Sequence, residues 1–111
     1  MGIAFLAIFW AMQMACHVSF KYGSTSAGRW VPFFLIGNGV GIVSTWILMM
    51  LYTRWNPNVA LGLGMGGGFL LSQLAIAVLF RSQLSLLQIA GVVAIGLGMA
   101  LLTGGGVAVK A

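Results

Sequence analysis

Residues 59–104 read VALGLGMGGGFLLSQLAIAVLFRSQLSLLQIAGVVAIGLGMALLTG, which is two apolar runs separated by Arg81, Ser82 and Gln83. A helix rises about 1.5 Å per residue, so about 20 apolar residues cross the hydrocarbon core of a bilayer. Each run, 59–80 and 84–104, is long enough to do so. The polar residues between them leave room only for a tight turn. The stretch therefore predicts an antiparallel pair of transmembrane helices.

The same pattern occurs twice more, over residues 3–21 and 31–52. Hydrophobic residues make up 61% of the 111 and charged residues only 5%, whereas soluble domains carry about 25% charged residues. Pro32 is expected in the first turn of the second helix, where its missing N–H costs nothing. We therefore predict an all-α integral membrane protein: a single four-transmembrane-helix bundle over residues 1–111, multi-pass in the cell inner membrane.

The chain contains no Asp or Glu and carries a net charge of +5. Carriers of protons or cations use acids inside the membrane, so that chemistry is not available within a single chain. The same lack removes the acid of a Ser-His-acid triad, and a lone histidine makes no metal site. We expect neither an enzyme nor a bound metal or cofactor.

The basic residues lie at the ends of the apolar segments and in the gaps between them: Lys21, Arg29, Arg54, Arg81 and Lys110. Anionic lipid headgroups are the natural partners of charges in such places. No basic cluster with interleaved aromatic residues occurs, so nucleic acid is not expected as a partner. Arg29 and Arg81 lie in two connections on the same side of the membrane, where we expect them, with Lys21, to attract a phosphate headgroup.

Polar residues inside the predicted helices are the candidates for a substrate path. Gln13, His17 and Lys21 are spaced by four, which places them on one stripe of the first helix. An unpaired amide in hydrocarbon costs several kcal/mol, so Gln13 should face the bundle interior, a partner chain or a water-filled cavity. The stripe is either a polar ladder for a headgroup or a set of interhelical hydrogen bonds with Lys21 as an anchor. Asn38 and Gln73 are further candidates for facing a cavity.

Glycine is frequent and unevenly placed in the last three predicted helices. Gly91 and Gly98 are seven apart and share one face of the last helix, and small residues let membrane helices approach closely. This spacing predicts a dimer interface. The third helix carries a denser group, which favours either close packing or a flexible, kinked segment, because Gly costs about 1 kcal/mol relative to Ala in a helix interior. That group is Gly62, Gly64, Gly66, Gly67 and Gly68.

Four short helices, a polar residue in the first and the Gly91–Gly98 pair in the fourth resemble the small multidrug resistance transporters, minimal members of the drug/metabolite transporter superfamily. The run from Gln13 to Lys21 looks like the family segment in which an essential glutamate precedes a lysine by eight residues. Here Gln13 takes the place of that glutamate. The layout from Val59 through Gly98 is similar without gaps.

The departures from that family limit what the resemblance implies. A glutamine cannot titrate, and the aromatic pair that lines the family's drug site is replaced by Leu61 and Gly64. The dimer architecture is implied, but the drug and proton chemistry is not. A second branch of the superfamily, the paired small subunits proposed to flip aminoarabinose linked to undecaprenyl phosphate, has polar non-acidic residues in its first helix and is similar in kind.

We expect a small membrane transporter or flippase subunit that moves an amphipathic substrate, lipid-linked or anionic. It would act as a homodimer or as a heterodimer with a similar small membrane protein, because one chain encloses too little to hide a polar path. Two alternatives stay open. One is a multidrug or cation exporter whose acid comes from a partner subunit. The other is a non-transporting accessory subunit of a larger membrane complex.

Overall fold

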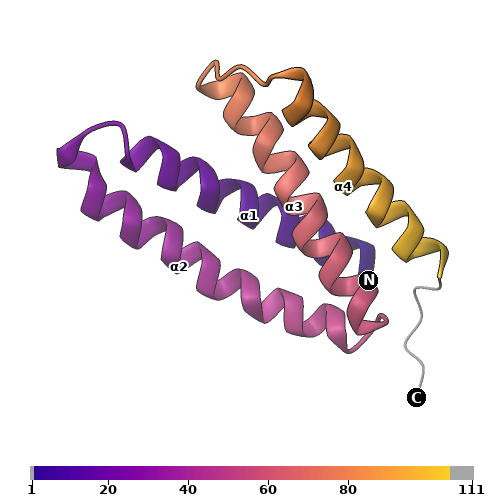
Figure 1. Cartoon of the computed structure of the whole chain (residues 1–111). Coiled ribbons are helices and arrows are strands. Elements are labelled where there is room, and N and C mark those ends of the chain that lie inside the picture. Colours follow the sequence, from indigo (N-terminus) through magenta and orange to yellow (C-terminus); the bar gives the residue numbers. More distant parts are fainter. Residues whose placement is uncertain (1, 106–111) are drawn as a thin grey trace.

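The computed structural model of the chain describes residues 2–105, which form four helices (Figure 1). They are α1 (Gly2–Gly23), α2 (Ala27–Tyr52), α3 (Pro57–Leu79) and α4 (Leu86–Gly104). Each is long and apolar enough to span a membrane, which confirms the predicted all-α membrane fold. Residues 1 and 106–111, including Lys110, lie outside the described part of the chain.

The second helix begins earlier than the apolar pattern indicates. It starts at Ala27, after Ser26 in an extended conformation, and Pro32 lies inside it. The prediction that Pro32 occupies the first turn was therefore wrong. Its missing N–H leaves the Gly28 carbonyl without its usual intrahelical donor. Gly28 is exposed at the end of the helix, where water and headgroups can supply the bond instead.

Side-chain caps set where the last two helices begin. The Asn56 side chain accepts from the backbone N–H groups of Asn58 and Val59, so α3 begins directly after it, at Pro57. Ser85 and Gln88 form a reciprocal capping box: the Gln88 N–H donates to Ser85 Oγ at 3.2 Å, and the Ser85 N–H donates to Gln88 Oε1 at 2.8 Å. These bonds satisfy N–H groups that a helix start leaves free. The last helix therefore begins at Leu86 and not at residue 84.

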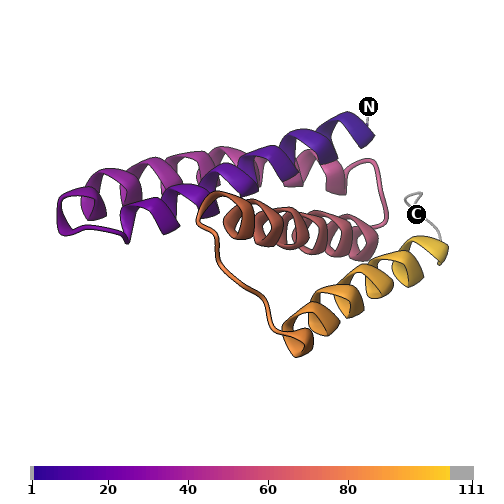
Figure 2. The same ribbon diagram turned by 90° about the horizontal axis from the view of Figure 1, so that it is seen from above.

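α3 is the central element of the arrangement. It packs against α1, α2 and α4, whereas α4 packs against α3 alone among the described helices. Figure 2 shows the α1–α2 hairpin on one side of α3 and α4 on the other. The buried apolar core lies where α1, α2 and α3 meet and contains Leu6, Phe9, Leu48, Leu51 and Ala60.

The glycine group of α3 lets α1 approach closely. Gly64, Gly67 and Gly68 are buried. A Cβ at Gly67 would overlap the Trp10 indole, and one at Gly64 would lie 3.3 Å from the Phe9 ring. Trp10 then donates its Nε1–H to the carbonyl of Leu63 at 2.9 Å. Small residues at such contacts bring helix backbones together.

Two further glycines of α3 face the opposite way. A Cβ at Gly62 would overlap Leu102, and one at Gly66 would lie 3.0 Å from Met99, both on α4. α3 runs unbroken from Pro57 to Leu79. Of the two interpretations of this glycine group, the structure therefore supports close packing and not a kink.

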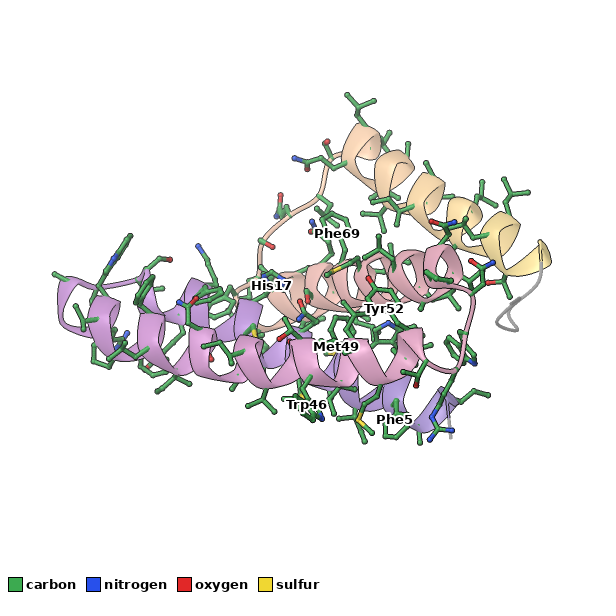
Figure 3. All side chains as sticks on the ribbon, turned by 90° about the horizontal axis from the view of Figure 1, so that it is seen from below. Phe5, His17, Trp46, Met49, Tyr52 and Phe69 are labelled. Carbon is green, nitrogen blue, oxygen red and sulfur yellow. The ribbon has the colours of Figure 1, made fainter. Side chains whose placement is uncertain are left out.

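α4 is the least enclosed element of the described chain. It contains no buried residue, and Leu86, Leu87 and Leu101 are each about four-fifths exposed or more. Trp46 of α2 likewise points away from the bundle (Figure 3). Apolar side chains in such places can contact lipid tails, and α4 in addition offers a face to another protein.

We predict that Gly67→Ala destabilises the bundle by about 1–3 kcal/mol, the usual cost of overpacking, because the new methyl group overlaps the Trp10 ring. Gly39→Ala is the matched control, since a Cβ there meets nothing within 4 Å. It should be neutral or stabilising, as alanine has the higher helix propensity. Unfolding by denaturing detergent, followed by circular dichroism, measures both. Equal effects of the two substitutions would contradict this packing.

Candidate functional site

Gln13 joins α1 to α2 through a hydrogen bond. Its Nε2 donates to Ser44 Oγ at 2.9 Å, and the fully buried Ser44 hydroxyl donates in turn to the carbonyl of Gly41 at 2.7 Å. The amide of Gln13 thus has a partner inside the protein. Of the two interpretations of Gln13, this contact supports the interhelical hydrogen bond.

A first groove of about 300 Å³ lies between α1 and α2. Three of its polar groups besides Gln13 already donate to backbone carbonyls: Asn38 Nδ2 to Phe34 at 2.7 Å, Thr45 Oγ1 to Ile42 at 2.6 Å and Cys16 Sγ to Gly37 at 3.2 Å. The groove's polar donors are therefore largely committed. Its lining residues are Gln13, Cys16, His17, Phe20, Gly37, Asn38, Gly41, Ile42 and Thr45.

A second groove, of about 130 Å³, lies between α1 and α3 and is lined by His17, Phe69, Ser72, Gln73 and Ile76. The polar side chains of this groove lack hydrogen bonds with the described residues, unlike most of those in the first groove. Ser72 is only 5% exposed, and its hydroxyl has no hydrogen-bond partner among residues 2–105. In the same part of the chain neither His17 nor Gln73 takes part in a side-chain hydrogen bond.

A third groove continues from the second. Phe69 and Gln73 also line a space of about 290 Å³ between α3 and α4, together with Leu84, Gln88, Gly91, Val92 and Ile95. Figure 3 shows Phe69 between α3 and α4, and His17 beside the C-terminal half of α3. The second and third grooves thus share two side chains and follow the same helix.

Three basic residues lie at one end of the bundle: Lys21 in the last turn of α1, Arg29 in the first turn of α2, and Arg81 in the α3–α4 connection. The prediction that Arg29 lies in a connection was wrong, because α2 begins at Ala27. Lys21 Nζ is 6.0 Å from the centre of the Phe80 ring, so it lies close to the α3–α4 connection that carries Arg81. The Arg29 guanidinium stacks on Tyr22 at 4.4 Å, at the tip of the α1–α2 hairpin. Arg81 is exposed and has a left-handed backbone, with φ of 53°.

The predicted path residues are therefore divided. Gln13 and Asn38 line the first groove, Gln73 lines the second and third, and His17 lines both the first and the second. Lys21 lies beyond them, next to Phe80. The even spacing of Gln13, His17 and Lys21 places them on one stripe, but their surroundings differ because α1 crosses between two helices.

Ser72 was not among the sequence candidates. Serine in a membrane helix commonly donates to its own backbone, so its presence alone carries little information. Here the hydroxyl makes no such bond with the described residues, and α1 packs against the helix that carries it. Only the tertiary structure shows this combination. The position of Ser72 next to Gln73 is the one signal that the sequence offers.

Gly91 and Gly98 face open space. A Cβ at either position would meet no atom within 4 Å among the described residues, and α4 has no neighbour except α3 there. Neither glycine is covered by a side chain of the described residues, and Gly91 also lines the third groove, between α3 and α4.

Scans of protein-family models, of curated proteins and of solved structures find no match to this chain. The resemblance to small multidrug resistance transporters therefore rests on the quoted residues alone. Within residues 2–105, no group of three or more histidine, cysteine or acidic side chains is placed to hold a metal ion.

We predict that Gln13→Leu and Ser44→Ala are coupled. Each single change removes the same interhelical hydrogen bond, so the double variant should be more stable than the sum of the two losses by about 0.6–1.7 kcal/mol, the range for such bonds in membranes. Detergent unfolding of the four proteins gives the coupling. The control cycle combines Gln13→Leu with Thr45→Ala. The Thr45 hydroxyl donates to a carbonyl of its own helix, so these two changes should be additive. Additive effects in the Gln13–Ser44 cycle would exclude the bond.

Proposed function

We propose that the chain is a subunit of a small transporter or flippase, placed in the inner membrane, that moves an amphipathic substrate with an anionic, phosphate-bearing headgroup. One observation carries the proposal. Ser72 is buried without a hydrogen-bond partner among residues 2–105, and the half-buried Gln73 and the exposed His17 line the same groove within apolar, membrane-length helices. A bundle built only for stability would satisfy such groups, because lipid cannot.

The charge of the chain supports an anionic substrate over a cationic one. With no Asp or Glu in 111 residues, a cation within the bundle would meet only repulsion from the basic residues. Lys21, Arg29 and Arg81 lie at the end of the bundle that holds two of its connections. Positive charges there can collect anionic headgroups from the membrane surface. A drug-cation exporter would need an acid from another subunit.

The open face of α4 supports a partner chain. α4 has no buried residue, and Gly91, Ala94 and Gly98 lie at helical spacing on it. Small residues at this spacing allow close contact with another helix. A homodimer, or a heterodimer with a similar small membrane protein, would cover the face. The same observation also favours the second candidate function, an accessory subunit that packs against a larger complex and moves nothing.

Transport is tested with the purified chain in liposomes that contain a fluorescent phosphoprenyl lipid. A membrane-impermeant quencher added outside destroys the signal of the outer leaflet, so any further loss reports lipid that crosses the bilayer. We expect faster loss than in empty vesicles, and no acceleration for an equally labelled lipid with a cationic headgroup. Rates equal to those of empty vesicles would contradict transport and leave the accessory subunit as the better account.

Association through α4 is tested with Gly91→Leu and Gly98→Leu. Either leucine should separate the helices and lower energy transfer between donor- and acceptor-labelled chains in liposomes, since the contact depends on close backbone approach. Gly39→Leu is the matched control, because a Cβ at Gly39 on α2 also meets open space. Unchanged transfer in both α4 variants would remove this face as the interface.

A further inference from the structure

His17 lines two grooves, and these differ in whether their other polar side chains already make hydrogen bonds within the protein. In the α1–α2 groove, Gln13, Asn38 and Thr45 each donate a hydrogen bond to the protein. In the α1–α3 groove, Ser72 and Gln73 make none with residues 2–105. A ligand therefore gains more hydrogen bonds on the α3 side of α1 than on the α2 side.

Ser72 is the most informative of these groups. It is 95% buried, since only 5% of its surface is exposed, and it lines the groove without a partner among the described residues. A buried hydroxyl without a hydrogen bond costs free energy that the fold must offset. A ligand atom that accepts from Ser72 would remove this cost. Native proteins contain few buried polar groups without a hydrogen bond, so this one requires an explanation.

The shape of the groove favours a lipid. α3 forms its floor, and α1 and α4 lie on either side without contacting each other (Figure 2). The polar space at His17, Ser72 and Gln73 adjoins the larger space along α4 through Phe69 and Gln73. Beyond Gln73 and Gln88 that larger space is mostly apolar, which suits an acyl or prenyl chain.

The donors in the groove favour a phosphate. The Ser72 hydroxyl, the Gln73 amide and an N–H of His17 can each donate to an oxygen. Lys21 lies next to Phe80, directly before Arg81, so positive charge lies at the end of α3 beyond Ile76. No Asp or Glu side chain opposes an anion, because the sequence contains neither residue.

We propose that the α3-floored groove binds an anionic lipid, with its phosphate on His17, Ser72 and Gln73 and its chain along the α3–α4 space. The site gives the proposed transporter its substrate contact and rests on that function. It places the headgroup on the α3 side of α1. Gln13 then serves, with Cys16, as one of the side chains that join α1 to α2 by a hydrogen bond.

The test is native mass spectrometry of the full chain with dioleoylphosphatidic acid, and with dioleoylglycerol as the matched lipid without phosphate. The chain should retain the first and not the second. Ser72→Ala with Gln73→Leu should weaken retention of phosphatidic acid by about tenfold or more, because hydrogen bonds to a charged group are lost. Thr45→Val with Asn38→Leu, in the α1–α2 groove, is the matched control and should retain the lipid fully. If the Ser72–Gln73 double variant does not fold, Ser72→Ala alone should still weaken retention.

Three results would overturn the site. Full retention by the Ser72 and Gln73 variants would exclude these donors. Loss in the Thr45–Asn38 variant instead would move the headgroup to the α1–α2 groove. Displacement of the lipid by millimolar inorganic phosphate would show that the site takes the free ion. The flipping assay is separate: a chain that binds the lipid at Ser72 and Gln73 but does not flip it keeps this site and loses the transport function.

Discussion

The hydrocarbon core of a membrane contains no hydrogen-bonding partner, so each polar side chain at that depth must find one within the protein or remain unsatisfied. Most of this bundle obeys that constraint through bonds between helices or back to the same helix, at Trp10, Gln13, Cys16, Asn38 and Thr45. Within the described residues, Ser72 is the buried exception. The packing of α1 and α4 against α3 creates this exception and places grooves beside it.

That geometry depends on α3, which uses glycine on two faces. Gly67 receives the Trp10 ring from α1, and Gly62 and Gly66 receive side chains from α4. Because α4 has α3 as its one neighbour among the described helices, it leaves both an outer face and a lateral groove uncovered. The proposed partner contact and the proposed lipid site therefore have the same origin, a fourth helix that the chain does not enclose.

The role that the resemblance predicts for the position of Gln13 differs from the contact that this side chain makes in the structure. The sequence pattern predicts that this place corresponds to the glutamate that binds cation and proton in small multidrug resistance transporters, although no comparison with known proteins finds a match. Here an amide donates to Ser44 and fastens α1 to α2. The dimeric small-transporter architecture is compatible with that role, whereas proton coupling through Gln13 is not, because an amide does not titrate. The free donors lie one turn further along α1, at His17, and across on α3.

The sequence by itself determined the number of membrane spans, their approximate limits and the list of polar residues inside them, because hydropathy and helix length act locally. It also indicated that the α3 glycines matter, without separating packing from kinking. Tertiary structure decided that α2 begins at Ala27, that Gln13 is bonded while Gln73 is free, and that Ser72 lies buried without a partner. Helical periodicity fixes the direction of a side chain around its own axis. What lies opposite depends on how other helices cross it, and those contacts join residues far apart in the chain.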